Sequence, residues 1–106
     1  MHRLTWSASE KRLARRAYDD ALESALAGLV SEFKARAAAV ATPADMWAIE
    51  DFLRQRRREI EETFDYRYSM LPLVFASLIR AGHLDEARLA GLSAEKREII
   101  RSILSL

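Results

Sequence analysis

The first half of the chain carries large apolar side chains at helical spacing. Between positions 22 and 40 they follow steps of three, four or seven residues: Leu22, Leu26, Leu29, Phe33 and Val40. Such a seam is typical of a long helix that packs against another helix at a shallow angle. Ser7 and Glu10 have the spacing of a capping box, in which each side chain accepts from the other residue's amide. We therefore predict a helix from about Ser7 to Val40.

A break and a second helix follow at Thr42-Pro43-Ala44-Asp45. Threonine can cap a helix, proline fits its first position, and aspartate favours the positive end of the helix dipole. The apolar series continues to about Phe64 through Met46, Ile49, Leu53 and Ile60. Arg56 occupies the missing step, with a long stem that can extend to water. Two long helices joined by a tight turn predict a hairpin.

Shorter helices are expected after residue 65. One runs from about Ser69 to Ala81 and ends at Gly82, a short one covers about Asp85 to Ala90, and a last one is capped by Ser93. Helix-favouring residues dominate the whole sequence. We predict an all-α fold in which one domain, 1–106, has a hairpin stalk at about 7–64 and a compact head at about 65–106.

The composition predicts a thin core. Half of the 106 residues are apolar, but eighteen of them are alanines. A domain of this length buries only about 65% of the surface of its unfolded chain, so a second copy would stabilise it. We expect a homodimer whose interface lies on the helical seam, at Phe33, Met46, Ile49 and Leu53.

The charges are dense but balanced, with 17 basic and 16 acidic residues, which argues against nucleic acid as a partner. Without cysteine the chain can form no disulfide and no zinc site built on sulfur. The N-terminus has no apolar signal core, and the longest apolar stretch, residues 70–79, is short and contains Pro72. We expect a cytoplasmic protein that does not insert into membranes.

Few residues suit catalysis. His2 and His83 are the only histidines, and we expect both to be solvated. The sequence has no glycine-rich phosphate loop, no Gly-x-Ser-x-Gly and no His-Glu-x-x-His. We therefore predict no catalytic residues, no metal site and no cofactor.

The segment 54–58 contains four arginines, which a nucleic-acid interface would place along a phosphate backbone. Acidic residues lie one turn before and directly after it, and pairs such as Glu50 with Arg54 and Arg57 with Glu61 have the spacing of helical ion pairs. A salt-bridged solvated face is the simplest interpretation, and phosphate binding or protein docking are the alternatives.

Trp47 lies on the same predicted helix, where Trp47, Glu50, Asp51 and Arg57 fall within an arc of about 120°. An aromatic ring beside an arginine and an acid is typical of a protein-binding hot spot. In the alternative interpretation, Trp47 packs in the core against the first helix and Asp51 pairs with Arg57 on the surface.

Two adjoining motifs mark the central part of the chain. The first is Trp47-x-x-Glu50-Asp51-Phe52-Leu53-x-x-x-Arg57-x-Glu59-Ile60, and the second is Phe64-Asp65-x-Arg67-x-Ser69-x-Leu71-x-x-Val74-Phe75-Ala76-x-Leu78. Together they resemble the cyanobacterial fluorescence recovery protein family. The resemblance spans most of the chain. It implies an all-helical homodimer without a cofactor, which binds the photoactivated orange carotenoid protein, chiefly its C-terminal domain, and speeds its return to the resting orange form.

The same resemblance implies roles for particular residues. Trp47, Asp51 and Arg57 match a functional patch near the dimer interface, and Met46 matches an apolar dimer contact. Leu73 and Phe75 match apolar positions of the head, a second partner-binding surface. Glu50 stands where the family has histidine and adds a negative charge beside Asp51. This departure leaves open a second interpretation, a dimeric helical scaffold whose partner is unrelated to photoprotection.

Overall fold

Helix α1, Ala8–Ala38, begins at the predicted capping box. The amide of Glu10 donates to Ser7 Oγ at 3.1 Å, and the amide of Ser7 donates to Glu10 Oε1 at 3.0 Å. In this computed structural model, which describes residues 4–106, the helix ends two residues before Val40. The amides of Ala39 and Val40 still donate to carbonyls of the last turn, and those of Ala41 and Thr42 both donate to Asp45 Oδ2 at 3.0 Å. His2 lies outside the described residues.

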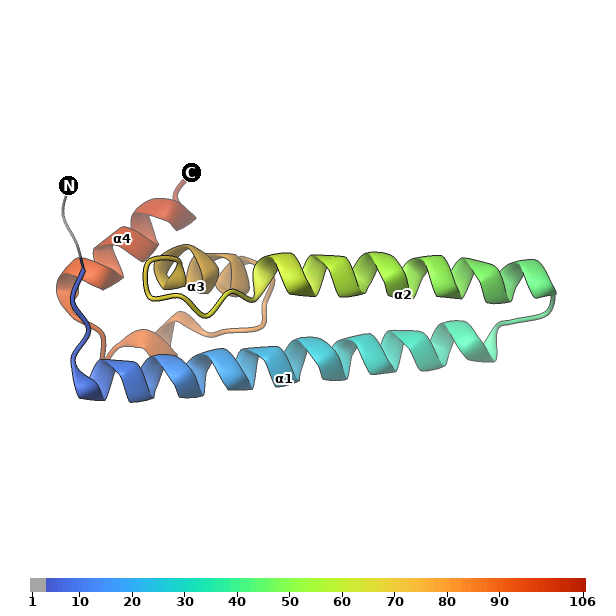
Figure 1. Cartoon of the computed structure of the whole chain (residues 1–106), viewed down its shortest axis with the longest axis horizontal. Coiled ribbons are helices and arrows are strands. Elements are labelled where there is room, and N and C mark those ends of the chain that lie inside the picture. The colour runs from blue at the N-terminus through green and yellow to red at the C-terminus, as the bar shows by residue number, and fades with distance from the viewer. Residues whose placement is uncertain (1–3) are drawn as a thin grey trace.

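Helix α2, Pro43–Thr63, starts at a second capping box formed by Thr42 and Asp45. It runs back antiparallel to α1, so the two helices form the predicted hairpin (Figure 1). The molecule is elongated, with extents of 54 × 24 × 23 Å. Both ends of the described chain lie at the head, at the opposite end from the α1–α2 turn (Figure 1).

Three further elements build the head. Helix α3 spans Leu71–Arg80, the 3-10 helix η1 spans Glu86–Leu89, and helix α4 spans Ala94–Leu104. Helix α3 starts later than predicted, because Pro72 belongs in its first turn. It ends at Arg80, one residue before the predicted end, and the predicted glycine follows: Gly82 has φ at +81°, and the amide of His83 donates to the Leu78 carbonyl at 2.9 Å. Helix α4 has its predicted cap, Ser93. The described residues contain no strand, so the chain is all-α.

The hydrophobic core lies in the head and includes the first half of α1. Helix α1 contributes small residues and one ring, Ala14, Ala17, Tyr18 and Ala21. The largest fully buried side chains come from the head elements and their connections: Leu71, Phe75, Leu78, Leu89 and Ile100. The alanines allow close approach, and a Cβ at Gly91 would lie 2.5 Å from Leu13 Cδ1. The head is therefore larger than residues 65–106, because its core needs one face of α1.

Aromatic rings fix the segment between α2 and α3 along α1. The ring centroids of Tyr18 and Tyr66 are 4.8 Å apart, and those of Tyr18 and Phe64 are 5.4 Å apart. Tyr68 lies 5.4 Å from Trp6, which precedes α1. Aromatic pairs at these separations, of which the two that involve Tyr18 are edge-on, stabilise a fold beyond the area that they bury. The end of the stalk is thus held in place on the head.

A buried ion pair joins the two ends of the chain. Lys96 Nζ lies 3.1 Å from Glu10 Oε2, and both side chains are at most 10% exposed. The amide of Ser93 also donates to Glu10 Oε2, at 2.8 Å. The backbone hydrogen bond from Ser7, further bonds from Ser93 and Lys96, and the charge of Lys96 together outweigh desolvation. They lower the pKa of Glu10 from 4.5 to about 2.

The Glu10 carboxylate is expected to make the stability of the folded chain sensitive to acid. Its pKa is lower in the folded chain, so between pH 4.5 and pH 2 the unfolded state binds more protons. The stability that Glu10 provides is complete above pH 4.5 and is lost as the pH falls towards 2. Urea denaturation across this range is expected to give a steeper acid-side loss for the native chain than for Glu10→Gln. Equal slopes would contradict the assignment.

Candidate docking surfaces on the stalk

The stalk has almost no core of its own. None of the 21 residues of α2 is buried. Helices of this length owe most of their stability to packing of an apolar face. Several large apolar side chains of the stalk are instead open to solvent: Leu26, Val30, Phe33, Met46 and Trp47. A single chain therefore leaves much of the apolar surface of its stalk exposed to water.

The facing sides of α1 and α2 are joined by polar and cation–π contacts. Arg36 lies 4.0 Å above the ring of Phe52, and Arg56 lies 5.2 Å from the same ring. Arg56 also pairs with Glu32 at 3.8 Å and with Glu59 at 2.9 Å. Its stem thus crosses between the helices while the side chain stays 38% exposed, so Arg56 reaches water as predicted but also contacts two carboxylates and a ring.

Apart from Trp47, the exposed apolar residues of the stalk share one face of the hairpin with half-buried apolar neighbours. We call this surface the apolar stalk face: Leu22, Leu26, Val30 and Phe33 of α1 with Met46, Ile49 and Leu53 of α2. On a helical wheel with 100° per residue, the stripe lies about 100° from the side of α1 that faces α2, and about 70° from the side of α2 that faces α1. Both angles are counted in the direction of increasing residue number. Antiparallel helices wind oppositely when viewed from one end. Both rotations therefore lead to the same side of the hairpin.

The predicted interface residues all belong to this face. Met46 is 51% exposed and Phe33 38%, while Ile49 and Leu53 are half-buried. The surface is hollowed along α1, where a shallow groove is lined by Asp19, Leu22, Glu23, Leu26, Ala27 and Val30. An apolar surface of this kind is typical of a protein contact.

A second surface of α2 carries Trp47, Glu50, Asp51 and Arg57, which we call the docking zone. All four are exposed, and Trp47 is 61% exposed. The alternative in which Trp47 packs in the core is wrong for this chain, because the side chain is exposed and is not part of the hydrophobic core. Arg57 pairs with Glu61 at 3.2 Å, not with Asp51. On the helical wheel Arg57 lies about 20° from Met46, so the zone borders the apolar stalk face.

The two acidic residues of the docking zone, Glu50 and Asp51, differ in their surroundings. Glu50 accepts from Arg54 at 2.8 Å, as its spacing predicts, so the extra negative charge at this position is partly neutralised. Asp51 points to solvent beside it. Arg54, Arg56 and Arg57 each pair with a carboxylate, which confirms the interpretation of the arginine segment as salt-bridged.

The two head residues expected to bind a partner have different environments. Leu73 is 47% exposed on α3 and is available for contact. Phe75 is fully buried between α3 and the rest of the core. Phe75 is therefore not open to a partner, contrary to the prediction, because most of α3 is buried: only Leu73 and Arg80 are exposed, and position 75 lies on the core side.

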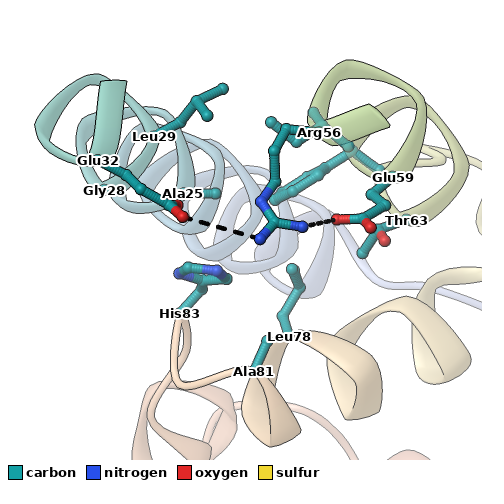
Figure 2. Close-up of a pocket in the computed structure, with 12 residues that line it drawn as sticks. Ala25, Gly28, Leu29, Glu32, Arg56, Glu59, Thr63, Leu78, Ala81 and His83 are labelled. Atoms are coloured by element: carbon teal, nitrogen blue, oxygen red, sulfur yellow. Dashed lines mark hydrogen bonds and ion pairs between the residues drawn. The ribbon is translucent and has the colours of Figure 1, made fainter. Parts of the chain in front are cut away.

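A cavity of about 410 Å³ lies where the stalk meets the head, and sequence analysis did not anticipate it. Figure 2 shows Arg56 above it, held between Glu32 and Glu59, with His83 and Leu78 approaching from the head. His83 Nδ1 lies 3.5 Å from Ser24 Oγ, so this histidine joins the head to α1. Within residues 4–106 no three His, Asp or Glu side chains converge to hold a metal ion. Nor is any helix in that range long and apolar enough to cross a membrane.

Comparison with known proteins agrees with this architecture. The chain is 32% identical to the fluorescence recovery protein of Synechocystis sp. over 101 residues, which covers 95% of this chain and 93% of that protein. The solved structure of the Fremyella diplosiphon protein superimposes with a TM-score of 0.91 at 33% identity, and that of the Synechocystis protein with 0.92 at 31%. Each alignment covers 96% of this chain and the whole of the solved chain.

The family model described as "photoprotection regulator fluorescence recovery protein" matches residues 6–104. The match includes both stalk helices, the docking zone and the head. The chain therefore belongs to the fluorescence recovery protein family of photoprotection regulators.

Proposed function

We propose that this protein binds the photoactivated orange carotenoid protein and accelerates its return to the resting orange state. Family membership favours this function over a scaffold with an unrelated partner. The observation that carries the proposal is the exposed Trp47 with Asp51 and Arg57 beside it on α2. These groups offer an aromatic and a charge-assisted contact to another protein surface.

We further propose that the working form is a homodimer joined through the apolar stalk face. Two copies would cover Phe33, Met46, Ile49 and Leu53, which one chain leaves at least partly exposed. On α2 the face is bordered by the exposed ion pair of Arg57 with Glu61. A dimer would also present two docking zones on one rigid body, each at the edge of the shared interface.

Such a regulator requires no acid or base. It accelerates recovery if it binds the conformation between the two photoreceptor states better than it binds the activated state. Two contact regions, the docking zone on the stalk and Leu73 on the head, would hold two loosened domains of the photoreceptor close together. The predicted cytoplasmic location fits this role.

The test is the red-to-orange decay of photoactivated orange carotenoid protein, followed by absorbance with and without this protein in excess. Acceleration is expected. No acceleration, while the Synechocystis protein works in parallel, would remove the proposed activity and leave a scaffold with another partner.

Arg57→Glu is expected to reduce the apparent affinity for the photoreceptor. Loss of one charge-assisted contact corresponds to about tenfold or more. The side chain is 82% exposed and pairs only at the surface, so the fold should be unaffected. Arg101→Glu is the matched control, because Arg101 Nε lies 3.1 Å from Glu86 and is 69% exposed, away from the zone. An equal effect of both variants would argue against a specific role for Arg57.

A further inference from the structure

A basic hollow of about 330 Å³ lies where the first turns of α1 meet η1. It is lined by Ser9, Arg12, Leu13 and Arg16 of α1 and by Arg88 of η1. The α1 residues follow steps of three and four and therefore share one side of the helix. At 100° per residue this side is rotated by about 170° from Glu32 and Arg36, which face α2. The hollow thus lies outside both the apolar stalk face and the docking zone.

The charges around the hollow are unusual for this molecule. Arg12 and Arg16 are four residues apart on a helix, where like charges repel. Both are exposed, and neither forms an ion pair with another described residue. Arg88 is held at the hollow by Asp20, 2.7 Å from its Nη2. The local charge is therefore positive although the chain as a whole is nearly neutral.

The neighbouring cations on α1 serve other purposes. Lys11 lies 5.5 Å from the Tyr68 ring centroid, and Arg15 lies 4.4 Å from that of Tyr66. Arg15 also pairs with Asp19 at 3.3 Å. Of the four cations in residues 11–16, these two stabilise the fold. Arg12 and Arg16 remain directed at the hollow with no contact within the fold that accounts for them.

We propose that this hollow binds a small, multiply charged oxoanion of the phosphate type. Guanidinium groups match the geometry of such an anion with paired N–H donors, and Arg88 approaches it from a different element than Arg12 and Arg16. A bound dianion would also remove the repulsion between Arg12 and Arg16, so binding should stabilise the folded chain.

The experiment is a titration of the full chain with inorganic phosphate, with chloride adjusted to keep the ionic strength constant. Thermal unfolding and amide NMR shifts are the two readouts. Saturable stabilisation is expected, with shift changes confined to the start of α1 and to η1.

Two double variants test whether phosphate binds at the hollow. Arg12→Gln with Arg16→Gln is expected to weaken phosphate binding by about tenfold or more, since two charge-assisted contacts are lost. Arg54→Gln with Arg58→Gln is the matched control, because it removes the same charge at the same spacing from α2. It should bind phosphate as the native chain does.

Three outcomes would overturn the proposal. They are an effect of phosphate no larger than that of chloride, an equal loss of binding in both double variants, and shift changes elsewhere in the chain. Because the assay contains no photoreceptor, its result is independent of the proposed recovery activity.

Discussion

Replacing Lys96 with methionine is expected to destabilise the chain by about 3–5 kcal/mol, since it leaves the Glu10 carboxylate buried without its cation. Lys96 Nζ also donates to the Thr5 carbonyl, so the substitution releases the segment before α1 as well. For a domain of this size the loss is a large part of the total stability. Urea denaturation at fixed protein concentration measures it, because assembly also contributes to the midpoint.

Lys34→Met is the matched control for this substitution. Lys34 is exposed on α1, and a surface change of this kind should alter the free energy of unfolding by no more than about 0.5 kcal/mol. Combining Glu10→Gln with Lys96→Met should recover part of the loss, because no uncompensated charge then remains buried. Equal effects of Lys96→Met and Lys34→Met would show that the pair does not stabilise the head.

Met46→Glu is expected to separate the proposed dimer. Met46 lies on the apolar stalk face, and burying an uncompensated carboxylate there is unfavourable by several kcal/mol. The dissociation constant should rise by at least about a hundredfold. Sedimentation velocity over a range of protein concentrations measures the change. The head should stay folded, because its core does not include Met46.

Ala44→Glu provides the control on the same helix. Residue 44 lies on the opposite side of α2 from the apolar stalk face, and its new carboxylate would stand in the first turn, where the helix dipole favours it. Its sedimentation should match that of the native chain. If Met46→Glu also leaves the particle unchanged, Met46 is not at the interface.

The helices were predictable from sequence because their signals are local. The capping boxes at Ser7 and Thr42, and Gly82 after α3, act within one turn of the chain. The all-α fold and the hairpin follow from these signals and from the apolar spacing. The boundaries shifted by one or two residues where Asp45 and Pro72 decided them.

The tertiary contacts were less predictable. Nothing in the spacing shows that Glu10 meets Lys96, since the two lie 86 positions apart. Phe75 and Leu73 are similar in sequence terms, and only the packing of α3 makes one buried and the other exposed. Likewise, Arg56 has the spacing of a surface arginine that pairs with Glu59 one turn later on α2. Its second partner, Glu32, is brought to it only by the packing of α1.

The docking zone was predictable as a helical arc but not as a solvent-exposed one. Trp47 fits both a core and a surface position on an amphipathic helix, and the structure resolves this by placing its ring in solvent. The basic hollow was missed for a different reason. Its signal is a dense run of cations at residues 11–16, but the third arginine comes from η1, which is distant in sequence.

The mass of the native protein in solution, measured by sedimentation equilibrium across a wide concentration range, tests most directly whether the apolar stalk face joins two copies. We predict a particle of twice the 12.1 kDa of one chain. A stable, well-ordered particle of 12.1 kDa at every concentration would contradict the account.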